Sequence, residues 1–130
     1  MGDMPDEPVL VREQRGAVLV LRLNRPAARN ALNGELLDQL GLALVGAETN
    51  PEVGCVVITG TGDRAFCAGM DLADFAAEGA MQPSAEGMAG FRRFTEGGIA
   101  APIVGAANAT AVAGGFEVLM GCDVVVTSAA

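Results

Sequence analysis

The feature that most constrains this chain is the stretch 110–123, where a loop of small residues passes through Gly114 and Gly115 into an apolar helical pattern. The first turn of a helix has unpaired N–H groups and the positive end of its dipole, so a glycine there lets a polarised oxygen approach closely. Glu117 follows Gly114 by about one turn and can face the same space. A carboxylate beside backbone donors indicates proton transfer next to a stabilised oxyanion. The pattern also suits a purely structural helix start, because acidic residues complement the dipole and glycines allow close packing.

The stretch 65–72 repeats this order of apolar strand, loop, small residues and acidic residue. Asp71 follows Ala68 by three residues, just as the glutamate follows Gly114. The backbone N–H groups of Ala68 and Gly114 are therefore predicted to form two donors aimed at one oxygen. The alternative is a hydrophobic turn in which Asp71 only caps a short helix.

The residue types that are missing exclude several kinds of chemistry. The 130 residues include no His, which excludes a Ser-His-Asp triad and a His-based metal site. All eight basic residues are Arg, so a Walker A loop and a Schiff base are also excluded. The arginines are scattered and the net charge is −8, which argues against a nucleic acid as partner. Carboxylates and backbone donors remain as the expected catalytic groups, with no metal.

The cysteines and the chain start indicate a cytoplasmic protein. Cys55, Cys67 and Cys122 lie in or beside apolar runs without metal-ligand spacing, which predicts buried, reduced thiols. Residues 1–8 have no basic region before an apolar core, so we expect a disordered acidic tail and not a signal peptide. The apolar stretch 99–120 is interrupted by polar residues and a proline, so we expect no membrane span.

Hydrophobic periodicity over residues 9–130 predicts a single α/β domain. The first two strands are expected at 9–12 and 17–23, joined as a hairpin by a turn at Arg15-Gly16. Further strands are expected at 53–59, 102–107 and 123–127, with another apolar strand beginning at 65, and helices at 34–49, 71–75, 85–96 and from 114. The continuous apolar run in 53–59 is typical of a strand covered on both faces. In the helix 85–96, the side chains expected to face inward are those of Met88, Phe91 and either Phe94 or Thr95, whereas Arg92 and Arg93 are expected to be solvated. The loop 79–84 is a candidate mobile cover over a site.

Four motifs in this order resemble the crotonase superfamily, the enoyl-CoA hydratase and isomerase family. They are Asn24-Arg25-Pro26 with Arg29-Asn30-Ala31-Leu32, then Val56-Val57-Ile58-Thr59-Gly60, then Ala65-Phe66-Cys67-Ala68-Gly69-Met70-Asp71-Leu72, and finally Ala113-Gly114-Gly115-Phe116-Glu117 with Cys122-Asp123. The resemblance implies a fold of repeated strand-strand-helix units, often a homotrimer or a hexamer, that binds acyl-CoA thioesters. Coenzyme A is then part of the substrate, and no separate cofactor is expected.

The resemblance also implies roles for individual residues. Ala68 and Gly114 match the family positions whose N–H groups form the oxyanion hole, and Glu117 matches the first of two catalytic glutamates. The positions expected to bind the substrate are Ala28, Arg29, Ala31, Ala68, Gly69, Met70, Asp71, Leu72 and Gly114. Arg25 and Arg29 either meet phosphates or are simply exposed charges.

The chain departs from the family pattern at Ala109 and Ala101, where a Gly and a Lys are usual, and in its length. The family's second glutamate lies beyond the Cys-Asp motif, so the sequence resembles the N-terminal part of a member, truncated at the C-terminus. The leading hypothesis is an enoyl-CoA hydratase-like protein whose parent fold hydrates trans-2-enoyl-CoA, with little hydratase activity expected from this chain alone. The alternatives are an inactive remnant that binds acyl-CoA weakly or only packs against other subunits, and a family isomerase, dehydratase, hydrolase or lyase.

Overall fold

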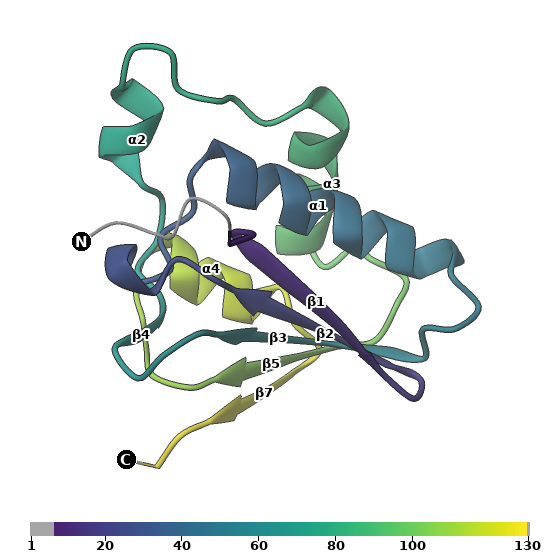
Figure 1. The fold of residues 1–130 in the computed structure, drawn as a ribbon. Helices are drawn as coiled ribbons and strands as arrows, with labels where there is room; N and C mark the ends of the chain where they lie inside the picture. Colours follow the sequence, from purple (N-terminus) through teal and green to yellow (C-terminus); the bar gives the residue numbers. More distant parts are fainter. Residues whose placement is uncertain (1–6, 130) are drawn as a thin grey trace.

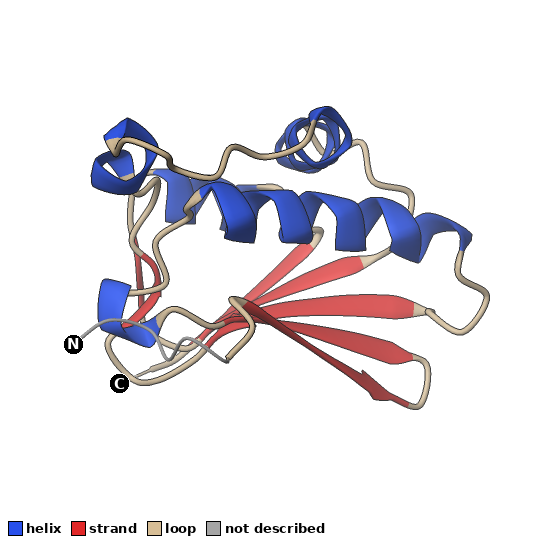
Figure 2. Cartoon of the chain, turned by 45° about the horizontal axis from the view of Figure 1, so that its top comes forward, coloured by secondary structure: helices blue, strands red, loops and turns tan. Residues whose placement is uncertain are grey.

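Helices lie over one face of a five-stranded sheet in the computed structural model, which describes residues 7–129 (Figures 1 and 2). The sheet order is β1 (Leu10–Arg15), β2 (Val18–Leu23), β3 (Cys55–Gly60), β5 (Ile103–Ala107) and β7 (Val124–Thr127). A second sheet pairs β4 (Ala65–Cys67) with β6 (Thr110–Ala111). The helices are α1 (Gly34–Thr49), α2 (Leu72–Ala76), α3 (Ala85–Thr95) and α4 (Gly114–Met120), with a 3-10 turn at Pro26–Ala28. This confirms the predicted α/β class, whereas most of the expected tail 1–8 lies outside the described residues.

The chain begins with the predicted hairpin, and the remaining neighbours in the main sheet are parallel. Gly16, with φ +58°, turns the chain between Arg15 and Val18, because a glycine adopts this left-handed conformation without strain. The predicted end of the first strand at residue 12 was wrong, since β1 continues to Arg15. The last residues of β1 are polar and do not alternate with apolar ones, but they still pair with β2 along the sheet edge.

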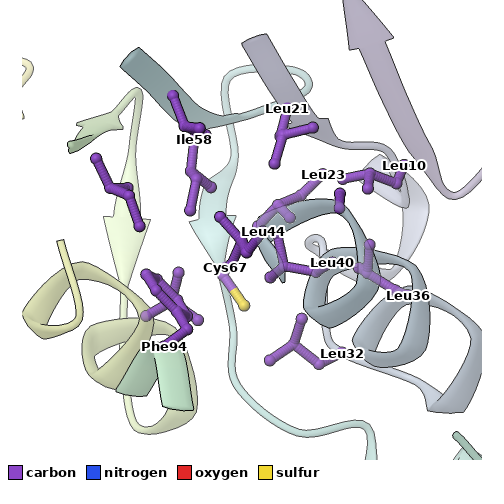
Figure 3. Packing of buried hydrophobic residues seen from close by; sticks show 14 of the residues in the cluster. Leu10, Leu21, Leu23, Leu32, Leu36, Leu40, Leu44, Ile58, Cys67 and Phe94 are labelled. Carbon is purple, nitrogen blue, oxygen red and sulfur yellow. The ribbon is translucent and has the colours of Figure 1, made fainter. Parts of the chain in front are cut away.

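Helix α1 supplies one side of the hydrophobic core and has the predicted bounds. The Asn33 side chain accepts a hydrogen bond from the Leu36 amide at 2.9 Å and so caps the first turn. Figure 3 shows leucines of α1 facing β2 and β3, with Phe94 of α3 at the other side of the same core. Full burial of each such side chain contributes about 1.5–3 kcal/mol, which makes this face the main source of stability.

Helices α1 and α3 approach each other through glycines. A Cβ added to Gly41 would stand 2.0 Å from the carbonyl oxygen of Gly87, and one on Gly90 would stand 2.5 Å from that of Gly41. Phe94 is fully buried as predicted, but Met88 and Phe91 are only half-buried, because the two α3 glycines occupy the contact with α1. The backbones therefore lie closer than any larger side chain allows.

We expect Gly41→Ala to lower the free energy of unfolding by about 1–3 kcal/mol, because the new methyl group meets α3 backbone that cannot move aside. The matched control is Gly46→Ala on the same helix, where the added Cβ meets nothing within 4 Å. That change should raise stability by about 0.5–1 kcal/mol through helix propensity. Urea unfolding followed by circular dichroism measures both, and an equal gain at the two positions would contradict the described packing.

The Glu48 carboxylate, near the end of α1, binds the loop that follows α3. Glu48 accepts hydrogen bonds from the Ala100 amide at 2.8 Å and from the Arg93 guanidinium at 2.6 Å. These two hydrogen bonds hold the pKa of the Glu48 carboxyl below its ordinary value, and the bond from the Ala100 amide contributes more than the bond from Arg93. Arg92 and Arg93 are both exposed as predicted, and Arg93 in addition forms this ion pair with Glu48.

We expect Glu48→Gln to weaken the fold most at neutral pH. A folded pKa below the unfolded value of about 4.3 means that the ionised group stabilises the native state above that pH. The contribution is lost as the pH falls through the folded pKa. Urea unfolding at pH 7 and at pH 3 should therefore show a difference between wild type and variant that shrinks in acid. A difference that is independent of pH would contradict this role.

No helix of residues 7–129 lies over the opposite face of the sheet (Figure 2). Val57 and Val104 are half-buried there and Val124 is 55% exposed, while Val56 and Ile58 on the helix side are fully buried. The prediction that the strand 53–59 is covered on both faces was therefore wrong for the described part of the chain. Among residues 7–129, no helix combines the length and the hydrophobicity that a membrane span requires.

Candidate active site

The two predicted site loops meet because β4 and β6 pair in parallel, with Cys67 opposite Ala111. The Val112 amide donates to the Cys67 carbonyl at 3.3 Å, so the residues that follow both strands lie side by side. Figure 1 shows β4 beside α4 at one end of the main sheet. Two residues of β6 are too few to show periodicity, which is why the sequence did not reveal this strand.

Glycines let the two loops approach closely. A Cβ on Gly115 would stand 2.0 Å from the Cys67 carbonyl oxygen, and one on Gly114 would stand 3.3 Å from the Cα of Gly69. Gly69 has φ +102°, a conformation that a side chain would strain. Its idealised Cβ would lie 3.2 Å from the Gly114 nitrogen. The predicted meeting of the 65–72 and 110–123 stretches is therefore present in the structure.

Ala113 directs the Gly114 amide. Its φ of 49° and ψ of −121° are those of the first central residue in a type II′ turn, which glycine normally occupies. The Gly115 amide closes this turn by donating to the Val112 carbonyl at 2.8 Å. Within residues 7–129, the Gly114 N–H donates to no acceptor. A strained residue thus holds one free donor at the start of α4.

The second predicted donor needs a correction. The Ala68 N–H donates to the Arg29 carbonyl at 3.1 Å, so its hydrogen is used within the chain and is not free for a ligand. The next amide, of Gly69, hydrogen-bonds the buried Cys67 thiol and opposes the rise that burial causes in the pKa of that thiol. The first N–H after β4 without an acceptor in the described chain is that of Met70.

The direction of the Met70 amide follows from its neighbours. The Leu32 amide donates to the Gly69 carbonyl at 2.8 Å, and the Asp71 amide donates to the Leu32 carbonyl at 2.9 Å. In this parallel bridge the N–H of the intervening residue points away from Leu32. A Cβ on Gly114 would stand 3.4 Å from the Met70 nitrogen, so the two free amides belong to adjoining backbone segments.

Asn30 joins three segments beneath these loops and is fully buried. Its side-chain oxygen accepts from the Arg25 amide at 2.9 Å, and its Nδ2 donates to the carbonyls of Thr61 at 3.0 Å and Ala65 at 2.9 Å. Its φ of 56° lies in the left-handed region, which asparagine tolerates better than most residues. The single amide side chain therefore fixes the first loop against the start of β4.

We expect Asn30→Ala to lower the free energy of unfolding by about 2–4 kcal/mol, because it leaves one buried donor and two carbonyls without their partner. The control is Asn33→Ala, which removes only the cap of α1 and should cost about 1 kcal/mol. Thermal and urea unfolding compare the two. Equal losses would show that Asn30 is only a local turn residue.

Glu117 lies exposed in the first turn of α4, and its carboxylate has no hydrogen-bond or ion-pair partner within residues 7–129. It is therefore free to act on a ligand near the Gly114 amide. Asp71 is not free, because its two oxygens bind the Asp74 amide at 3.0 Å and the Arg25 guanidinium at 3.0 Å. Arg25 is buried in this ion pair, so the alternative that it is an exposed charge was wrong, and its contact with a phosphate stays a prediction. Arg29 is exposed.

The other residues predicted to bind the substrate surround the bridge formed by Leu32 and Met70. Ala28 and Ala31 are half-buried in the first loop, whereas Met70 is 38% and Leu72 75% exposed beyond β4. The structure thus gathers the predicted residues at one place, and their contacts with a ligand stay a prediction. Within residues 7–129, no three carboxylate or thiol groups gather to hold a metal ion.

A hollow near the start of α4 is lined by neither Gly114 nor Met70. It has a volume of about 760 Å³ and is lined by the loop after β5, by Phe116 and Leu119 of α4, and by Thr127 and Ser128 at the end of β7. Glu117 does not line it either. The candidate site therefore consists of the free N–H donors and the free carboxylate, which lie outside this hollow.

Known proteins resemble this chain throughout. The sequence model described as Enoyl-CoA hydratase/isomerase matches residues 13–130. The short-chain-enoyl-CoA hydratase of Clostridium acetobutylicum is 33% identical over 122 residues, which are 92% of this chain and 46% of that protein. The crotonyl-CoA hydratase of Syntrophomonas wolfei is 35% identical over 116 residues, 88% of this chain and 44% of that protein. The solved structure of a carnitinyl-CoA dehydratase from Mycobacterium avium matches with a TM-score of 0.82 at 40% identity, covering 93% of this chain and 47% of that one. The chain thus spans about half the length of the curated relatives it matches.

Proposed function

Because the chain belongs to the enoyl-CoA hydratase/isomerase family, we propose that its site binds an acyl-CoA thioester and stabilises the enolate form of the acyl group. The thioester carbonyl would accept hydrogen bonds from the N–H groups of Gly114 and Met70. Both amides are free in the described chain and adjoin each other, and this observation carries the proposal. Each preorganised donor of this kind typically lowers the barrier by about 3 kcal/mol, since it meets the negative charge as it develops.

Glu117 would exchange the proton at the reacting carbon. Its carboxylate has no partner in the described chain and stands one turn beyond the Gly114 amide, so it can serve as an acid or a base. In a hydratase, the same group would help to add water to a trans-2-enoyl-CoA. An isomerase or a dehydratase would use the same oxyanion hole, because each reaction passes charge onto the thioester oxygen.

A second candidate function is acyl-CoA binding without hydration. The observation that favours it is that the nearby carboxylate of Asp71 is bound to Arg25 and to the Asp74 amide, so Glu117 would have to act alone. One base can remove an α-proton, whereas hydration also requires an activated water molecule. We propose a homotrimer or hexamer and a cytoplasmic location on the family resemblance alone.

We expect two signals when the wild-type chain binds acyl-CoA. A conjugated dienoyl-CoA should absorb at longer wavelength when bound, because the two N–H donors draw charge onto its carbonyl. Butyryl-CoA in D2O should exchange its α-protons, as seen by NMR. In Glu117→Gln the absorption shift should remain, while the exchange rate should fall by about 10²-fold or more, because the base is lost.

The matched control is Glu35→Gln, which alters a glutamate in the first turn of α1 and should change neither signal. Hydration of crotonyl-CoA, measured in parallel, separates the two candidate functions. Turnover that depends on Glu117 favours the hydratase, and proton exchange without turnover favours binding alone. A bound dienoyl-CoA without any absorption shift would contradict the oxyanion hole.

A further inference from the structure

Arg25 is the one buried cation among residues 7–129, and two contacts of its side chain lie beside the candidate site. Its Nη1 donates to the Ala31 carbonyl at 2.7 Å and to the Asp71 carboxylate at 3.0 Å, and the side chain is only 10% exposed. A buried guanidinium requires such partners, because its loss of hydration is otherwise uncompensated. The side chain thus joins the loop 25–32 to the residue that follows Met70.

Asp71 is held from three directions. Its amide donates to the Leu32 carbonyl, one carboxylate oxygen accepts from the Asp74 amide, and the other accepts from Arg25. The first contact sets the backbone, the second starts α2, and the third is the only one that involves an opposite charge. The Met70 N–H belongs to the same peptide group as the Gly69 carbonyl, so it keeps its direction while that carbonyl and the Asp71 amide both stay bonded to Leu32.

We propose that Arg25 is a positioning residue for the oxyanion hole, a role that rests on the proposed function. Through its ion pair with Asp71, it keeps the Met70 N–H directed to the side where the Gly114 N–H lies. In this role, Arg25 does not touch the reacting atoms. It acts by keeping the two loops in register, so that two donors and not one meet the thioester oxygen.

The test uses the absorption shift of a bound conjugated dienoyl-CoA together with its dissociation constant. We expect Arg25→Gln to lose about half of the shift or more, because one of the two donors is misdirected. The dissociation constant should change less than about threefold, since most of the ligand lies outside the carbonyl contact. Arg25→Lys, which keeps the charge, should retain more of the shift than Arg25→Gln. A residue needed only for folding would lower the folded fraction without changing the shift of the ligand that is bound.

Asp71→Asn covers the case in which Arg25→Gln fails to fold, because asparagine can still cap α2 while losing the charge. It should also reduce the shift. The matched control is Arg93→Gln, which breaks the ion pair with Glu48 and should leave the shift unchanged. A full shift in folded Arg25→Gln or Asp71→Asn would overturn the positioning role alone. No shift in the wild-type chain would overturn the oxyanion hole and this role together.

Discussion

The site depends on two backbone segments lying closer together than side chains would permit. Gly115 packs where a Cβ would stand 2.0 Å from the Cys67 carbonyl oxygen, and Gly69 packs against Gly114. The parallel pairing of β4 with β6 holds this contact, although β6 has only two residues. Because both N–H groups that could bind a ligand belong to the backbone, their position is set by sheet geometry and not by rotamers. Helices α1 and α3 also pack closely because glycines lie at their contact.

Buried polar groups give these loops a single arrangement. Asn30 satisfies one donor and two carbonyls, and Arg25 binds the Ala31 carbonyl and the Asp71 carboxylate. Apolar packing would tolerate small slips between the loops, whereas a buried hydrogen bond loses most of its energy when its geometry changes. The leucines of α1 supply stability, and these polar contacts supply the register that an oxyanion hole requires.

Much of the fold could be predicted because its local signals agree. The bounds of α1 follow from the Asn33 cap and the leucine spacing, and the glycine turn marks the hairpin. Predictions failed where tertiary pairing overrode periodicity, as in the polar end of β1, or where the element was too short, as in β6. Arg92 and Arg93 looked equally solvated, yet only one of them meets Glu48, which lies 45 residues earlier.

The sequence by itself predicted a site built from a carboxylate and backbone donors, and it named Gly114 and Glu117. It also determined family membership, since the motifs and their order are written in the chain. Only the tertiary structure decided which amide joins Gly114. Ala68 precedes Asp71 by three residues, as Gly114 precedes Glu117, and this equal spacing predicted Ala68. The Ala68 N–H, however, donates to the Arg29 carbonyl, and the free N–H is that of Met70. A spacing gives only the number of residues between two positions, whereas an N–H stays free only if folding brings no carbonyl within hydrogen-bond distance of it.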